Sequence, residues 1–231
     1  MKQTEIALIV GAGSGLSASL ARLFAGEGMR VAFAARNSDK LAGLAKESGA
    51  RAYACDAARP DEVALLFEAV SRDLGDPNVV VYNAGLRVRG TIDSLEPGKV
   101  KSALEIGAFG GFLVGQQAAK RMLKSGRGTI LFTGATASVK GYPDSAPFAM
   151  GKFALRGLAQ SMARELAPKN IHVSHIVIDG GIASSYAKPE DAGADRWLDP
   201  DAIALEYLHL HRQHRSAWSW EIELRPWVEK Y

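Results

Sequence analysis

A short glycine-rich segment near the start of the chain has the composition of a phosphate-binding turn. Gly11-Ala12-Gly13-Ser14-Gly15 follows the apolar run 6–10 and precedes a predicted helix that begins at Leu16. A helix N-terminus presents unpaired N–H groups and the positive end of its dipole, and glycines let a pyrophosphate approach the backbone. A glycine turn that serves packing is the alternative. The segment predicts five residues that bind a dinucleotide: Gly11, Gly13, Ser14, Gly15 and Leu16.

A second pattern places an aromatic ring and an amine one helical turn apart, in Phe148-Ala149-Met150-Gly151-Lys152. A third, Asn83-Ala84-Gly85, ends another predicted strand. Together with the glycine turn, these motifs resemble the short-chain dehydrogenase/reductase family, whose active-site motif is Tyr-x-x-x-Lys. In that family the tyrosine exchanges a proton with substrate, while the lysine lowers the tyrosine pKa and holds the nicotinamide ribose. The resemblance implies a nicotinamide-cofactor protein in which Phe148 replaces the proton-transferring tyrosine.

The resemblance also implies that two further proton-handling groups are missing. The family's catalytic serine, thirteen residues before the tyrosine, corresponds to Ala135. The asparagine of the catalytic tetrad corresponds to Gly107, and neither Ile106 nor Ala108 restores an amide if the alignment shifts by one. Lys152 is therefore the retained member of the tetrad, and its ribose-binding role does not need the phenol. A plain surface lysine is the alternative.

Further cofactor contacts are implied at the ends of other strands. Asp56 matches the family's adenine-binding aspartate, and Asn83 its asparagine, for which a turn-forming role is the alternative. Arg36 directly follows the second predicted strand, and Ala35 stands where NAD-preferring members carry an acid. A guanidinium there suits the 2′-phosphate of NADP, so we expect NADP(H) in preference to NAD(H), with a solvated loop charge as the alternative. The expected contacts beyond the glycine turn are Arg36, Asp56, Asn83, Ala84, Gly85, Lys152, Gly180 and Ile182.

The chain departs from the family's nucleotide motifs at four positions. Val10 and Ser17 replace the threonine and the last glycine of the phosphate-binding motif, and Tyr82 replaces the first asparagine of Asn-Asn-Ala-Gly. Asp179 replaces the proline of a Pro-Gly pair after the sixth strand. For Asp179 we expect turn formation or capping in preference to ligand contact.

Other residues could supply a proton in place of the missing phenol. Tyr142 lies in the loop before Phe148, and Tyr186 lies in the segment that usually covers the substrate in this family. A water molecule held by Lys152 is another donor. Isolated hydroxyl groups are weak acids near neutral pH. Those closest in sequence to the predicted site belong to Thr136, Ser138 and Ser145.

Short apolar runs alternate with helical patterns along the whole chain. We expect strands at 6–10, 30–35, 50–55, 78–82, 129–132, 171–178 and 218–224, and helices at 16–27, 38–48 (with Ser38 as cap), 60–74, 99–124, 147–166 and from Asp199 onward. This alternation predicts a single doubly wound Rossmann-type α/β domain over residues 1–231. Its seven-stranded parallel sheet has the order 3-2-1-4-5-6-7 with helices on both faces. Residues 183–198 are expected to form a short substrate-covering segment.

Composition narrows the class of protein and its compartment. A formal charge of +3 is too small to indicate nucleic-acid binding. No apolar run reaches the length of a spanning helix, and the N-terminal residues predict no signal peptide. A single cysteine, Cys55, suits a reducing compartment, so we expect a cytoplasmic protein. His209, His211 and His214 are two and three residues apart, and because His209 and His211 cannot share a helical face, no metal site is expected.

Two features indicate self-association. The stretch 218–227 alternates large apolar and polar residues like an exposed edge strand, and the predicted helix 99–124 carries Gly107, Gly110, Gly111 and Gly115. Each helix-interior glycine costs roughly 1 kcal/mol relative to alanine, which close backbone packing within the subunit or against a partner would explain. Because the family usually forms dimers or tetramers, the resemblance implies a homodimer or homotetramer.

Two functions fit these observations. The first is an atypical NAD(P)(H)-dependent oxidoreductase on an unknown small carbonyl or alcohol substrate, with a non-standard proton source. The second is a catalytically impaired dinucleotide-binding pseudoenzyme that acts as a sensor or assembly partner.

Overall fold

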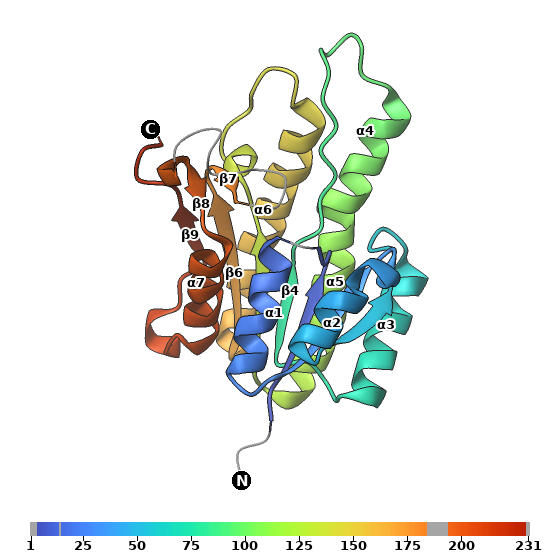
Figure 1. The fold of residues 1–231 in the computed structure, drawn as a ribbon, viewed down its shortest axis with the longest axis vertical. Helices are drawn as coiled ribbons and strands as arrows, with labels where there is room; N and C mark the ends of the chain where they lie inside the picture. The colour runs from blue at the N-terminus through green and yellow to red at the C-terminus, as the bar shows by residue number, and fades with distance from the viewer. Residues whose placement is uncertain (1–3, 14, 184–193, 230–231) are drawn as a thin grey trace.

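The computed structural model describes residues 4–13, 15–183 and 194–229, and these form a three-layer α/β structure (Figure 1). A seven-stranded parallel sheet has the order β3-β2-β1-β4-β5-β6-β9, which confirms the predicted order with β9 as the seventh strand. Its strands are β1 (Ile6–Val10), β2 (Arg30–Ala35), β3 (Arg51–Ala54), β4 (Val79–Tyr82), β5 (Gly128–Thr133), β6 (Ile171–Ile178) and β9 (Glu221–Leu224). Two short strands, β7 (Gly181–Ile182) and β8 (Trp197–Leu198), pair separately.

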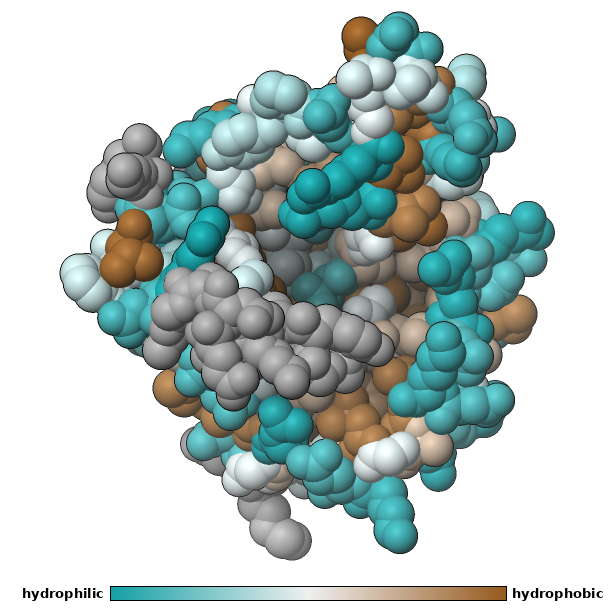
Figure 2. Space-filling model, turned by 45° about the horizontal axis from the view of Figure 1, so that its top comes forward, coloured by the Kyte–Doolittle hydropathy of each residue, from teal (hydrophilic) through white to brown (hydrophobic). Residues whose placement is uncertain are grey.

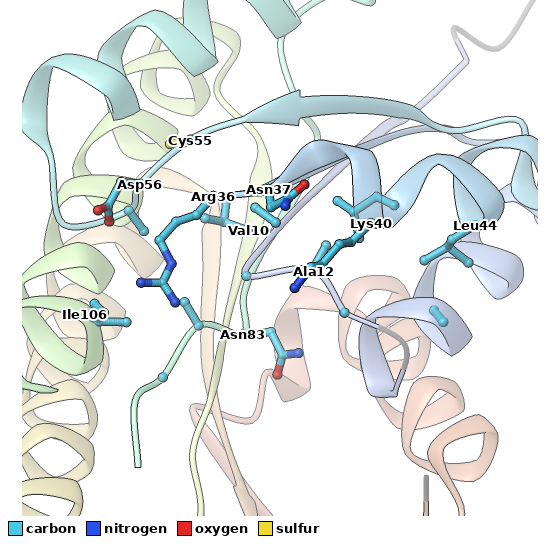
Figure 3. Close-up of a pocket in the computed structure, with 18 of the residues that line it drawn as sticks. Val10, Ala12, Arg36, Asn37, Lys40, Leu44, Cys55, Asp56, Asn83 and Ile106 are labelled. Carbon is cyan, nitrogen blue, oxygen red and sulfur yellow. The ribbon is translucent and has the colours of Figure 1, made fainter. Parts of the chain in front are cut away.

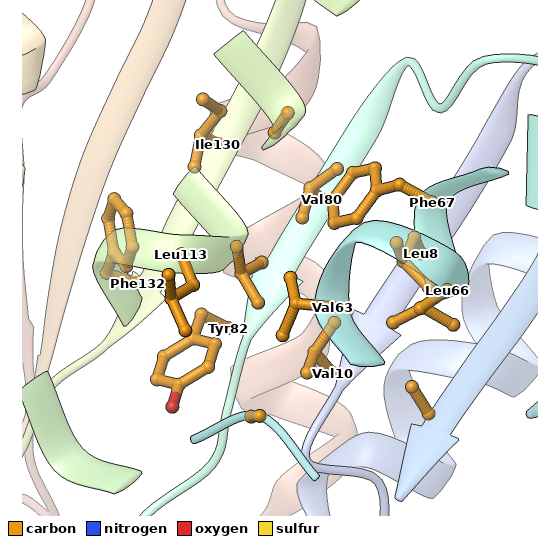
Figure 4. Close-up of a cluster of buried hydrophobic side chains, with 14 of the residues drawn as sticks. Leu8, Val10, Val63, Leu66, Phe67, Val80, Tyr82, Leu113, Ile130 and Phe132 are labelled. Carbon is orange, nitrogen blue, oxygen red and sulfur yellow. The ribbon is translucent and has the colours of Figure 1, made fainter. Parts of the chain in front are cut away.

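Helices cover both faces of the sheet because its central strands are apolar on both sides. Every residue of β1, β4 and β6 is buried. One core lies between the sheet and α3 (Pro60–Asp73), α5 (Gly110–Ser125) and α6 (Ala146–Leu166), and Figure 4 shows part of it around Tyr82. The other core lies against α1 (Leu16–Gly26) and α7 (Pro200–Arg212). The remaining helices are α2 (Ala42–Ser48) and α4 (Pro97–Leu104).

The predicted helix 99–124 is interrupted. Residues Glu105–Phe109 form a π-helical turn between α4 and α5, where the Tyr82 hydroxyl donates a hydrogen bond to the Ile106 carbonyl. A Cβ on Gly110 would lie 2.4 Å from the Tyr82 hydroxyl oxygen, and one on Gly111 would lie 2.4 Å from Leu155. The glycines therefore serve packing within the subunit, where the helix passes over β4 and against α6. π-Turns of this kind are often found at functional sites.

Two local predictions were wrong. Ser38 does not cap a helix. The cap is Asn37, whose side-chain amide oxygen accepts a hydrogen bond from the Asp39 N–H (3.1 Å) at the start of a 3₁₀ turn. The edge strand is shorter than 218–224, since Trp218 stacks on His172 with ring centroids 4.8 Å apart instead of extending the sheet. Within the described ranges, no helix is long and apolar enough to cross a membrane.

Candidate active site

A pocket of about 780 Å³ opens at the carboxyl ends of the central strands (Figure 3). It lies between β1 and β4, where the order of the strands in the sheet reverses. Open parallel α/β sheets bind their ligands at this point. Seven of the residues predicted to bind a dinucleotide line it together: Gly11, Gly13, Arg36, Asp56, Asn83, Ala84 and Gly85.

The glycine turn leaves room above the start of α1. Gly11 has φ +87°, and a Cβ there would lie 2.3 Å from the Ala84 nitrogen, so the close approach of two strand ends requires glycine. Around Gly13 and Gly15, by contrast, an added Cβ would meet no described atom within 4 Å. This open cradle, next to the first N–H groups of the helix at Leu16, fits a pyrophosphate. Ser14, also predicted as a contact, lies outside the described residues.

Asn83 joins the glycine turn to the end of β4. Its side-chain amide donates to the Ser17 hydroxyl (2.8 Å), and that hydroxyl donates to the Gly11 carbonyl (3.3 Å). Ser17, which departs from the expected glycine, therefore has a positive role: it connects α1, β1 and β4 through one hydroxyl. The Asn83 backbone also donates to the Val10 carbonyl (2.8 Å).

Cationic side chains from the segment after β2 line the pocket. Arg36 extends into it with its guanidinium on the side of Asp56 and Ile106 (Figure 3), and Lys40 also lines it. The carboxylate of Asp56 accepts from the Ala58 N–H (3.0 Å), which holds it at the turn after β3. Arg22 also lines the pocket but pairs with Glu47 (3.6 Å) and lies near Asp201. Sequence reasoning missed Lys40, whose signal is its position in the turn after β2.

The amine of Lys152 lies beside Gly85, a residue that lines the pocket. A Cβ on Gly85 would lie 3.8 Å from the Lys152 Nζ, and this amine donates to the Thr133 carbonyl at 2.7 Å. Lys152 is 5% exposed. Its burial, together with the nearby charge of Arg87, lowers the pKa of its ammonium group from 10.5 to about 8. The predicted catalytic lysine is thus placed next to the predicted cofactor residues.

Phe148 lies against two cations. The Lys152 Nζ is 5.8 Å from the centroid of its ring, and the Arg87 guanidinium carbon is 4.8 Å from the same centroid. Sequence reasoning missed Arg87, although its place in the loop that follows Asn83-Ala84-Gly85 is a signal. No described hydroxyl or carboxylate replaces the phenol in these ring contacts.

The other two altered positions are apolar and packed. Gly107 lies in the π-turn, where a Cβ would be 3.4 Å from the Gly151 Cα, so the π-turn approaches α6 closely there. The Ala135 N–H donates to the buried Ser138 hydroxyl (3.1 Å). Ser138 is therefore engaged in the turn after β5.

A family model described as "short chain dehydrogenase" matches residues 5–194. The chain belongs to the short-chain dehydrogenase family. A short-chain dehydrogenase from Rhodopseudomonas palustris has a similar structure, with a TM-score of 0.85 and 37% identity over 97% of this chain and 100% of that one. A variant of actinorhodin polyketide ketoreductase with NADPH has a TM-score of 0.90 and 25% identity over 99% and 98% of the two chains. The 3-oxoacyl-[acyl-carrier-protein] reductase of Bos taurus is 29% identical over 80% of this chain and 78% of its own.

In this short-chain dehydrogenase, the segment after β6 is built around an ion pair. The carboxylate of Asp179 lies 2.8 Å from the Arg225 guanidinium and is 6% exposed, which agrees with a structural role in preference to ligand contact. Gly180 and Ile182, expected to contact the cofactor, follow this ion pair but are not among the residues that line the pocket. Residues 184–193 of the expected covering segment 183–198, with Tyr186, lie outside the described residues.

The remaining candidate proton donors are less favourably placed than Lys152. Tyr142 is 50% exposed, and its carbonyl accepts from the Ser145 hydroxyl (3.0 Å). No described contact joins either side chain to Phe148 or Lys152. In the part of the chain that the structure describes, no three His, Cys, Asp or Glu side chains converge as metal ligands. His211 instead contacts the Thr129 hydroxyl (3.0 Å).

Proposed function

We propose that this chain is an NADP(H)-binding oxidoreductase that acts on a small carbonyl compound or the corresponding alcohol, with Lys152 as the source of the proton. The observation that carries the proposal is the position of the buried Lys152 amine beside Gly85, which lines the same pocket as Arg36 and Asp56. Gly13 and Gly15 would hold the pyrophosphate of a dinucleotide bound in this pocket, and Lys152 would bind its nicotinamide ribose.

The cationic side chains that line the pocket support NADP(H) in preference to NAD(H). Arg36 and Lys40 are exposed to the pocket, and Glu47, which also lines it, is paired with Arg22. A guanidinium matches the geometry of a phosphate group, whereas the 2′-hydroxyl of NAD is usually bound by a carboxylate. Two structural relatives, the ketoreductase described above and a metagenomic short-chain oxidoreductase at 26% identity, carry NADPH and NADP respectively.

Carbonyl reduction needs a hydride and a proton. The bound cofactor supplies the hydride. With a pKa of about 8, Lys152 is largely an ammonium group at neutral pH, and a water molecule held by that group delivers the proton to the carbonyl oxygen. The Thr133 carbonyl fixes the direction of the amine. Losing a positioned acid costs on the order of 10²–10⁴ in rate, so turnover is expected to be slow for the family.

A pseudoenzyme is the second candidate function. Phe148, Ala135 and Gly107 leave nonpolar groups at three tetrad positions, and each is accommodated by packing or cation–π contacts. A dinucleotide-binding sensor or assembly partner needs the pocket but not the proton donor.

We further propose a single domain over residues 1–231, a cytoplasmic location and a homodimer or homotetramer. Phe109, Phe112, Met150 and Phe153 are 44%, 41%, 49% and 45% exposed on neighbouring helical elements, which supports a contact between copies of the chain. The glycines of α5 pack within the subunit, so they do not add to that argument.

Two measurements test the proposed function. NADPH and NADH binding are followed by fluorescence titration, and NADPH oxidation is then followed with a panel of aldehydes and ketones. We expect NADPH to bind more tightly than NADH, and turnover by the native chain to be abolished in Lys152→Ala. Tight NADPH binding with turnover in Phe148→Tyr but none in the native chain would favour the pseudoenzyme. Failure to bind either dinucleotide would rule out both functions.

A further inference from the structure

We propose that Arg87 and Lys152 form an anion subsite against Phe148, and that the substrate is a small oxo acid or hydroxy acid whose carboxylate binds there. This inference rests on the proposed function and assigns a substrate class to the same site. Two positive groups lie against the Phe148 ring: the Arg87 guanidinium carbon is 4.8 Å from the ring centroid, and the Lys152 Nζ is 5.8 Å from it.

The loop that carries Arg87 is fixed next to the start of α6. The Gly90 N–H donates to the Asp144 carbonyl at 3.1 Å, which joins the segment after β4 to the loop before α6. Phe148 is half-buried in the first turn of α6, and Lys152 follows one turn later. These connections hold Arg87 over the ring without an ion pair.

The two cations lack a compensating carboxylate. Among the described residues, no Asp or Glu oxygen lies within 4.0 Å of the nitrogens of the exposed Arg87 or the buried Lys152, whereas the partly buried Arg156 and Arg121 each have an acidic partner. Arg87 raises the electrostatic cost of the Lys152 charge. The quadrupole of the Phe148 ring offsets part of that cost. An anion bound next to both cations would offset the repulsion between Arg87 and Lys152. The site would therefore favour anionic over neutral substrates.

The position of the subsite indicates what the anion belongs to. Lys152 lies beside Gly85, which lines the pocket where a dinucleotide is expected, and Arg87 is exposed next to the half-buried ring of Phe148. Figure 2 shows a hollow in the face of the molecule turned toward the viewer, with both hydrophilic and hydrophobic side chains around it. A guanidinium binds a carboxylate through two parallel N–H groups and orients it, which would fix the neighbouring carbonyl carbon.

The test uses oxamate, an analogue of a 2-oxo acid, and oxamide, its neutral isostere. Binding of each to the protein saturated with NADP is measured by calorimetry for the native chain, Arg87→Gln and Arg89→Gln. Arg89 is the matched control because it is exposed in the same loop and its change removes the same charge. We expect oxamate to bind at least tenfold more tightly than oxamide, Arg87→Gln to weaken oxamate at least tenfold, and Arg89→Gln to change it less than twofold.

Separate outcomes identify which proposal fails. NADP binding with equal oxamate affinity in the native chain and Arg87→Gln would overturn the subsite and leave the proposed function intact. Weakened NADP binding in Arg87→Gln, measured without oxamate, would assign Arg87 to the cofactor and also overturn it. Inorganic phosphate that binds as tightly as oxamate would overturn the carboxylate class. Absence of NADP binding in the native chain would instead refute the proposed function.

Discussion

The Lys152 amine donates a hydrogen bond to the Thr133 carbonyl at 2.7 Å, which ties α6 to the end of β5. This bond positions the amine without needing a hydroxyl group at position 148. The lysine therefore keeps its place beside Gly85 even though the phenol that would accompany it in the family is absent. This separation of positioning from proton transfer makes the active site testable by single substitutions.

Phe148→Tyr is expected to raise the turnover of NADPH with small carbonyl substrates by roughly 10–100-fold, because it adds a proton donor beside the Lys152 ammonium group. The measurement is kcat for NADPH oxidation at neutral pH. Phe153→Tyr, on the same helix but 45% exposed, is the control and should leave kcat unchanged. An equal gain in both variants, or none in Phe148→Tyr, would contradict the assignment of this position.

The buried amine of Lys152 should make stability depend on pH. Burial and Arg87 lower its pKa from 10.5 to about 8, so between these pH values the unfolded chain binds a proton that the native chain does not. The Lys152 contribution to the free energy of unfolding should therefore rise as pH increases from about 8 to 10.5, and above pH 9 it is opposed by the buried Cys55 thiol, whose pKa is raised from 9.0 to about 12. Lys152→Met should remove that rise and stabilise the cofactor-free protein at pH 7 by roughly 1–3 kcal/mol.

Urea denaturation at several pH values measures this effect. Lys101→Met is the control, because that lysine side chain is 77% exposed and its replacement should leave the pH dependence between 8 and 10.5 as it is in the native chain. A loss of stability in Lys152→Met at pH 7, or an unchanged pH dependence of the free energy of unfolding above pH 8, would show that the buried amine does not destabilise the native protein.

Gly11→Ala and Gly13→Ala should separate folding from cofactor binding. A methyl group on Gly11 would lie 2.3 Å from the Ala84 nitrogen at φ +87°, so Gly11→Ala is expected to destabilise the fold by about 3 kcal/mol or more. A methyl group on Gly13 meets no described atom within 4 Å, so stability should change little. It would occupy space needed by the pyrophosphate, and NADPH affinity should fall about tenfold. Urea denaturation and NADPH titration give the two readouts, and the reverse pattern would contradict the assignment.

Arg36→Ala should reduce the preference for NADP(H). Removing one charge-assisted contact to the 2′-phosphate costs roughly 1.5–3 kcal/mol, which corresponds to about 10–100-fold weaker NADPH binding, while NADH binding should change less than about twofold. Fluorescence titration measures both affinities. Arg59→Ala is the control, because that arginine side chain is 62% exposed and pairs with Asp61 (3.6 Å). A parallel loss of NADPH and NADH affinity would place Arg36 on a shared part of the cofactor.

The sequence was sufficient to predict the strand order and most helix positions. Runs such as Ile6–Val10, which is wholly apolar and buried along its full length, are recognisable as central strands. The helical segments between such strands require right-handed crossovers. The cap of the last helix was equally local: the side chain of Asp199 accepts from the Asp201 N–H at 2.9 Å. Local patterns of this kind depend on residues close together in the chain.

The interruption of helix 99–124 was not predictable from local pattern. The Tyr82 hydroxyl, from a strand 24 residues earlier, meets the Ile106 carbonyl and occupies the space above Gly110. The predicted edge strand was too long for a similar reason, because Trp218 stacks on His172 of the neighbouring strand β6. In both cases a contact with a residue distant in sequence determined the backbone conformation.

The candidate site shows the same division. The residue types of the glycine turn, Asn83-Ala84-Gly85, Phe148 and Lys152 were enough to predict a dinucleotide pocket with altered proton chemistry. The tertiary structure decided which side chains meet: Asn83 with Ser17, 66 residues apart, and Arg87 with Phe148 from a different loop. The reactions available to a site depend on its residue types, which can be read directly from the sequence. Contact between distant residues depends on how the strands and helices pack, and only the folded chain contains that information.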